Sequence, residues 1–143
     1  MTVMSVPHEM TIPRRLAGRY LKIELMGISG SFDFVFDKLT FKTQTSVTNE
    51  APALASTTDP LVRDIYKVGL NTLKECMQTV YEDGPKRDRR LWIGDLYLEA
   101  LANAHTFKNH ELTKHCLYLL AAFANDEGLL HATLLGKPQP HPQ

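Results

Sequence analysis

The chain has 143 residues, of which 43% are hydrophobic and 22% are charged, so it is the size of one globular domain. Sixteen basic residues balance sixteen acidic ones, which leaves no overall field to attract nucleic acid or an anionic membrane. This composition excludes disorder throughout the chain and argues against a nucleic-acid-binding function.

Before position 45, apolar and polar residues alternate in short stretches, which is typical of β-strands. Residues 1–15 show no periodicity and contain two prolines, which favours an extended lead-in. Apolar residues then alternate with polar ones over 19–25, a glycine-containing turn follows at 27–30, and the alternation resumes over 32–36. The pattern predicts two antiparallel strands, with a third over 38–43.

Ser, Thr, Ala and Pro are concentrated from Gln44 to Thr58, which is typical of a linker. We therefore expect a β segment over residues 1–45, a linker over 46–58 and a helical segment over 59–143. Two or three strands cannot enclose a core alone. The β segment must either pack on the helices in an α+β domain or form part of a larger sheet.

A first helix is predicted to begin at Asp59 and Pro60. The aspartate can accept hydrogen bonds from the free amides of the first turn, and proline fits the first helical position. Apolar residues then recur at spacings of mostly three and four, which predicts one buried stripe. The stripe consists of Leu61, Ile65, Val68, Leu73, Met77 and Val80.

Two further helices are predicted to form a hairpin. Asp95 begins the first, which continues to Phe107, and Asn109 caps the second, which continues to Phe123. A connection of about two residues makes the helices antiparallel. Residues 129–135 are predicted to form a short strand.

The connection from Asp83 to Asp95 has the densest charge in the chain. It contains three carboxylates, four cations and the only tryptophan, between two predicted helices. One interpretation is a solvated loop, in which Asp83 starts a turn and Asp95 caps the next helix. The other interpretation is a functional site.

The end of this connection resembles a signature of the α-L-rhamnosidase family of glycoside hydrolases, family 78. Its members carry Gly-Trp-Thr-Gly-Asp at a helix start, and Trp92, Gly94 and Asp95 match this segment, whereas Leu91 replaces the first glycine and Ile93 the threonine. The family's catalytic domain is an (α/α)6 barrel preceded by a β-sandwich. The resemblance therefore implies an α+β chain that joins the end of a β-sandwich to the first helical hairpins of the barrel, in a truncated member.

The resemblance also implies a catalytic residue. Family members place a glutamate, the general acid, before the tryptophan segment, and the matching position here is Asp88. The shorter side chain withdraws the carboxyl group by about one bond length. Arg87 and Arg89 flank Asp88 and favour its ionised form, so burial or nearby carboxylates must reverse this effect if Asp88 is to act as an acid.

The substrate-binding residues implied by the resemblance are Asp83, Arg87, Trp92 and Asp95. The two aspartates would accept hydrogen bonds from sugar hydroxyls, and the indole would form an apolar wall for a deoxy-sugar. The general base of the family is a glutamate on a later helix, to which no residue of this chain can be assigned.

The resemblance therefore implies an α-L-rhamnosidase-like glycosidase. Inverting hydrolysis needs a second carboxylate about 6.5–9.5 Å from the acid, across the sugar, which one loop does not easily supply. We therefore expect a chain that is inactive alone. The alternatives are a non-catalytic carbohydrate-binding or interaction module and a helical scaffold without a ligand.

No other class of site is indicated. Cys76 and Cys116 lack neighbouring ligands, and the histidines lack metal-ligand spacing, so no metal or cofactor is expected. No signal peptide or membrane span is predicted, and a cytoplasmic location is the expectation. The expected partner is a carbohydrate, with self-association through exposed apolar faces.

Overall fold

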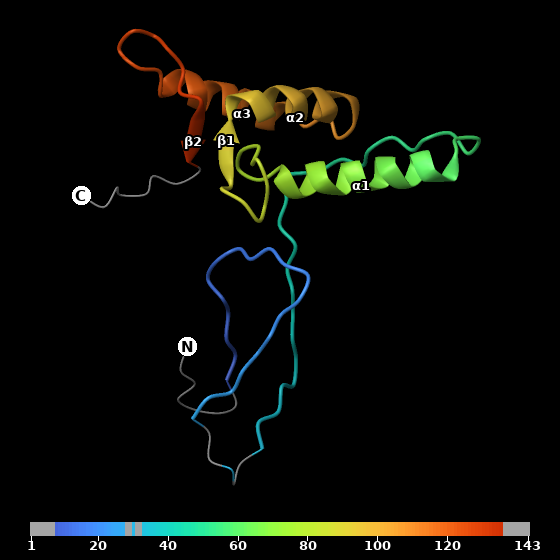
Figure 1. Cartoon of the computed structure of the whole chain (residues 1–143), viewed down its shortest axis with the longest axis vertical. Coiled ribbons are helices and arrows are strands. Elements are labelled where there is room, and N and C mark those ends of the chain that lie inside the picture. The colour runs from blue at the N-terminus through green and yellow to red at the C-terminus, as the bar shows by residue number, and fades with distance from the viewer. Residues whose placement is uncertain (1–7, 28–29, 31–32, 136–143) are drawn as a thin grey trace. The chain divides into compact units, whose positions relative to one another are not determined.

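The computed structural model describes residues 8–27, 30 and 33–135. The chain divides into two compact units, Met1–Phe34 and Val35–Gln143. All the helices and strands assigned in the described residues belong to the second unit (Figure 1). None of these helices is long and apolar enough to cross a bilayer.

The strands predicted before residue 45 are not formed in the described part of this region, which carries no helix or strand. Alternate residues such as Leu21, Ile23 and Leu25 remain 43–47% exposed instead of being covered on one face. Strands of this length need a buried face as well as hydrogen-bonded neighbours, and these apolar residues have no such face here. Residue 32 of the predicted second strand and residues 28–29 of the predicted turn lie outside the described residues.

Helix α1, Pro60–Cys76, begins as predicted. The Oδ1 atom of Asp59 accepts a hydrogen bond from the Leu61 amide at 2.8 Å, and Pro60 occupies the first turn. The helix ends before the predicted stripe does, because Met77 is extended and forms a bridge with Tyr81. Residues 77–81 therefore make a tight turn that leads into the charged loop.

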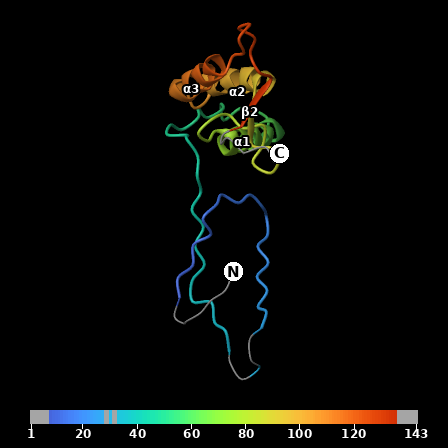
Figure 2. The ribbon, with the colours of Figure 1, turned by 90° about the vertical axis from the view of Figure 1, so that its left-hand side faces the viewer.

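The predicted hairpin consists of α2, Ile93–His105, and α3, His110–Ala122. Figure 1 shows α3 running back along α2, and Figure 2 shows α1 beside this pair. Asn109 caps α3 as predicted, since its Oδ1 accepts from the Leu112 amide at 3.2 Å. Residues 106–109 form the connection, which is longer than expected.

Asp95 is not the N-cap of α2, and that prediction is wrong. The cap position is Trp92, which makes no side-chain capping bond, and Asp95 lies in the first turn. The helix can start early because the Ile93 amide donates to the Ala132 carbonyl at 3.0 Å, which satisfies one free amide from another part of the chain.

The sheet is a two-stranded antiparallel pair of β1, Arg90–Trp92, and β2, Thr133–Leu135. In its register Leu91 faces Leu134 and Trp92 faces Thr133. The strand predicted over 129–135 is therefore formed in its last three residues. Three helices and this sheet confirm the α+β class, although the sheet is not the one expected at the N-terminus.

The core lies where the end of α1, the 77–81 turn, β1 and the hairpin meet. Its fully buried side chains are Tyr81, Met77, Leu91, Asn103 and Cys116. Part of the expected linker is attached to this core: the Ser46 amide donates to the Met77 carbonyl at 2.9 Å, and the Asn109 Nδ2 donates to the Ser46 carbonyl at 2.9 Å.

Candidate functional site

The charged loop is closed at its base by Asp83 and Arg90. The Asp83 amide donates to the Arg90 carbonyl at 3.0 Å, and the Arg90 amide donates to the Asp83 Oδ1 at 3.0 Å. Asp83 is half-buried, and one oxygen of its carboxylate is occupied by the Arg90 amide. The prediction that Asp83 starts a turn and the prediction that it binds sugar are compatible, because a carboxylate has a second oxygen that can accept hydrogen bonds.

The residues between these two positions form an arch that is largely exposed. Lys86, Arg87 and Asp88 are exposed, and Asp88 has no hydrogen bond or ion pair among the residues the structure describes. Arg89 adopts a positive φ of 54°, which is uncommon for a residue with a side chain, and its Nε donates to the Pro85 carbonyl at 2.7 Å. The arch therefore presents Asp88 and Arg87 to solvent.

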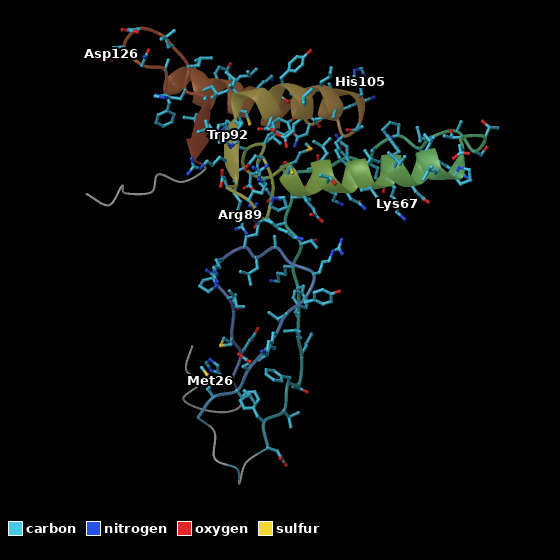
Figure 3. All side chains as sticks on the ribbon, in the orientation of Figure 1. Met26, Lys67, Arg89, Trp92, His105 and Asp126 are labelled. Carbon is cyan, nitrogen blue, oxygen red and sulfur yellow. The ribbon has the colours of Figure 1, made fainter. Side chains whose placement is uncertain are left out.

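Trp92 and Asp95 lie where β1 passes into α2. Figure 3 shows Trp92 at the end of β1 next to α2 and Arg89 at the opposite end. Trp92 is half-buried and Asp95 is exposed. The Asp95 carboxylate lies in the first helical turn, where the dipole of α2 favours a negative charge.

Glu99 is a residue of this region that the sequence analysis missed. It lies one turn after Asp95 on α2, is half-buried, and its Oε2 is enclosed without a hydrogen-bond partner in the described residues. Burial raises the pKa of Glu99 to about 8, with further increases from the negative charges of Asp95 and Asp83 and an opposing hydrogen bond from the Cys76 thiol. The spacing of four residues from Asp95 is the sequence signal that could have identified it.

The Cys76 thiol at the end of α1 belongs to the same environment. Burial raises its pKa to about 12, and Glu99, Glu82 and Asp83 add to the increase. Cys116 is also a buried thiol, as predicted, and its Sγ accepts from the Tyr81 amide at 3.4 Å. Neither thiol is available as a nucleophile, because a thiolate is disfavoured in both positions.

Two of the predicted site residues share an environment in the structure. The negative charges of Asp83 and Asp95 both raise the pKa of Glu99, so the base of the loop and the start of α2 form one acidic region. Asp88 and Arg87 lie on the exposed arch of the same loop. In the described part of the chain, no group of three or more His, Cys, Asp and Glu side chains is arranged to hold a metal ion.

Two shallow grooves lie elsewhere on the helices. A groove of about 400 Å³ runs between α2 and α3, and one of about 230 Å³ lies between α1 and α2. Both are mainly apolar, and neither is lined by Asp83, Asp88, Trp92 or Asp95. The candidate site is therefore an open surface and not part of either groove.

Family comparisons cover both the loop and the hairpin. Residues 51–140 match the bacterial α-L-rhamnosidase six-hairpin glycosidase domain, and residues 1–43 match the N-terminal domain of glycosyl hydrolase family 78 α-rhamnosidases. The chain belongs to the α-L-rhamnosidase family of glycoside hydrolases. The resemblance inferred from the Trp92–Asp95 segment is thereby confirmed, and the whole charged loop lies inside the matched glycosidase domain.

A solved structure is similar to part of this rhamnosidase-family chain. It is a rhamnosidase from Klebsiella oxytoca with rhamnose bound, 50% identical, with a TM-score of 0.62. The similarity covers 66% of this chain and 18% of the Klebsiella protein. No curated protein matches the chain.

Proposed function

We propose that the charged loop is the acid side of an inverting α-L-rhamnosidase site, with Asp88 as the general acid. The observation that supports this most directly is the closure of the loop by Asp83 and Arg90, which presents Asp88 on an exposed arch inside the matched glycosidase domain. A general acid must reach the oxygen of the leaving group, and an exposed carboxyl group on an arch can do so. The burial that offsets Arg87 and Arg89 is not present in this chain and would have to come from the bound sugar and the rest of the glycosidase domain.

The other predicted residues receive complementary roles in this proposal. Asp83 uses one carboxylate oxygen to hold the loop and offers the other to a sugar hydroxyl. Asp95 accepts from a second hydroxyl, and the half-buried Trp92 provides an apolar surface for the methyl group of a 6-deoxy sugar. Arg87, next to Asp88 on the arch, contacts the substrate from the exposed side.

We infer that the substrate class is α-L-rhamnosides, since the similar Klebsiella protein holds rhamnose. We also infer that the chain alone does not turn over such substrates. The site is open, and inverting hydrolysis needs a base on the opposite face of the sugar at about 6.5–9.5 Å from the acid. Asp83, Asp95 and Glu99 are grouped around the loop base and α2, so none of them is a candidate for that opposite face.

Two measurements on the purified chain test the proposal. Hydrolysis of an aryl α-L-rhamnoside should not exceed the rate in buffer. The opposing base is missing and the sugar is not enclosed, so the leaving oxygen is not held against Asp88 and the general acid gain of about 10²–10⁴-fold is not realised. Addition of L-rhamnose should shift the NMR signals of the loop and the start of α2, and Asp95→Asn should weaken this response. Turnover that Asp88→Asn abolishes would refute the inferred inactivity. An absence of any response to L-rhamnose would refute the sugar site.

A further inference from the structure

Glu99 is a half-buried acid with one enclosed carboxylate oxygen, and the proposed hydrolysis has no use for it. Glu99 lies on α2 in the same environment as the Cys76 thiol at the end of α1 and Asp83 at the loop base, since both groups affect its pKa. Its Oε2 is enclosed and has no hydrogen-bond partner within residues 8–27, 30 and 33–135. A charged oxygen in this position would lack both water and a donor, which is strongly unfavourable.

Three carboxylates contribute negative charge to the surroundings of Glu99. The charged groups with the largest effect on it are the carboxylates of Asp95, Asp83 and Glu82. The titratable groups that interact with it come from α1, the loop, α2 and α3, and they are Cys76, Tyr81, Glu82, Asp83, Asp95 and Cys116. A fourth negative charge among these groups would repel Asp83 and Asp95, whereas a neutral carboxyl group does not.

We propose that Glu99 is a positioning residue which, in its neutral form, spares Asp83 at the loop base and Asp95 at the start of α2 the repulsion of a further negative charge. This role rests on the proposed function of those two aspartates. The Asp83 Oδ1 accepts a hydrogen bond from the Arg90 amide at 3.0 Å, which closes the loop. Ionisation of Glu99 adds a negative charge that repels the Asp83 carboxylate and thereby weakens this closure. Loss of that closure removes the geometry in which Asp83 and Asp95 meet one sugar.

The proposal predicts a defined dependence of stability on pH. The pKa of Glu99 is about 8 in the folded chain and about 4.5 as its ordinary value. The native state therefore binds the extra proton between these values, so the stability that Glu99 provides is complete below pH 4.5 and is lost as the pH rises through 8. Over this window the folding equilibrium constant falls by up to about tenfold per pH unit because of this group.

The test compares the wild type with Glu99→Gln, which keeps the shape of the neutral side chain and cannot ionise. Urea unfolding is measured from pH 5 to pH 9, and the two chains should be equally stable at pH 5 while the variant becomes the more stable as the pH rises. Glu75→Gln is the matched control, since Glu75 is an exposed glutamate on α1, and it should follow the wild type. Parallel curves for the wild type and Glu99→Gln, or a Glu99→Gln chain that does not fold at pH 5, would overturn the proposal.

A second measurement links the residue to the site. The NMR response to L-rhamnose in the wild type should be lost between pH 7 and pH 9, and Glu99→Gln should retain it, which a residue with only a packing role would not produce. Loss of the response at the same pH in both chains would overturn the positioning role. If neither chain responds to the sugar at any pH, the proposed function fails. The urea unfolding of the wild type and Glu99→Gln then decides by itself whether the surroundings of Glu99 keep it neutral.

Discussion

Asp83 contributes to the candidate site through its backbone as well as its carboxylate. It makes a reciprocal pair of hydrogen bonds with Arg90, so the two ends of the arch are joined independently of any ligand. A loop held in this way loses little conformational entropy when a ligand binds.

We predict that Asp83→Ala destabilises the chain by about 1–3 kcal/mol, because it leaves the half-buried Arg90 amide without its carboxylate acceptor. Asp88→Ala is the control in the same loop and should change stability by no more than about 0.5 kcal/mol, since Asp88 is exposed. Urea unfolding of both variants checks this. Equal effects would show that Asp83 does not hold the loop.

Asn103 is the buried polar residue on which the hairpin connection depends. Its Oδ1 accepts from the Asn109 amide at 3.0 Å, and its Nδ2 donates to the Asn109 carbonyl at 2.9 Å. Because Asn109 also caps α3 and donates to the Ser46 carbonyl, this pair joins the hairpin to the segment before α1.

Replacing Asn103 by alanine should therefore cost about 2–4 kcal/mol, from two lost hydrogen bonds whose partners stay partly buried. Asn71→Ala, at an exposed position on α1, should change stability by less than about 0.5 kcal/mol. The comparison requires chemical unfolding at one protein concentration. A loss below about 1 kcal/mol for Asn103→Ala would mean that water replaces the side chain.

At the scale of elements, the helix starts were predictable because capping is local chemistry. Asp59 and Asn109 lie next to the residues whose amides they accept, so a few neighbouring letters determine the outcome. The start of α2 was placed two residues too late because the Ile93 amide is satisfied by Ala132, which is distant in the chain. The β1–β2 pair was unpredictable as a pair for the same reason, although β2 itself was expected.

The candidate site was predictable to a similar extent. The density of charge and the Trp92–Asp95 segment located the loop, and the family was correctly inferred from them. The sequence could not show that Asp83 closes the loop or that Glu99 is enclosed, because both depend on how the loop base packs on α1 and α2. The roles of Asp83, Arg87, Asp88, Trp92 and Asp95 stay predictions, as do the division of the chain at 46–58 and the location in the cell.

Asp59 gives a test at the level of the helix. Asp59→Ala should cause fraying of the first turn of α1, since the Leu61 amide loses its acceptor at 2.8 Å, with a loss of about 0.5–2 kcal/mol. Hydrogen exchange at the Leu61 amide should become faster, and Asp59→Asn should largely preserve the protection because asparagine caps comparably. Unchanged exchange in Asp59→Ala would show that Pro60 alone sets the helix start.

On the scale of the whole molecule, much of the apolar stripe predicted for α1 is not covered. Leu73, Met77 and Val80 are buried as expected, whereas Leu61, Ile65 and Val68 are 66%, 63% and 64% exposed. The hairpin likewise exposes Tyr97, Leu98 and Tyr118.

The similar Klebsiella protein is several times longer, with this chain spanning 18% of it. A contiguous apolar surface of more than a few hundred Å² on a soluble chain marks a contact site.

We predict that the chain associates with further copies of itself through the exposed stripe of α1. The positions of Leu61, Ile65 and Val68, four and three residues apart, place them on one face of the helix, so two copies can bury them against each other. Sedimentation velocity should give a mass above 16.2 kDa that increases with protein concentration. The double variant Leu61→Gln, Ile65→Gln should shift the distribution toward the monomer, because each change removes about 1.5–3 kcal/mol of possible apolar burial.

The control for this prediction is Arg63→Gln, Lys67→Gln, which alters exposed charged positions on the same helix and leaves the apolar stripe intact. If association depends on the stripe, this control should associate as the wild type does. If it depends on charge, the control should change and the apolar variant should not. A wild-type chain that stays monomeric at every concentration would contradict the prediction and would mean that an isolated α1 tolerates its exposed stripe, since surface leucines and isoleucines scattered singly are common on soluble proteins.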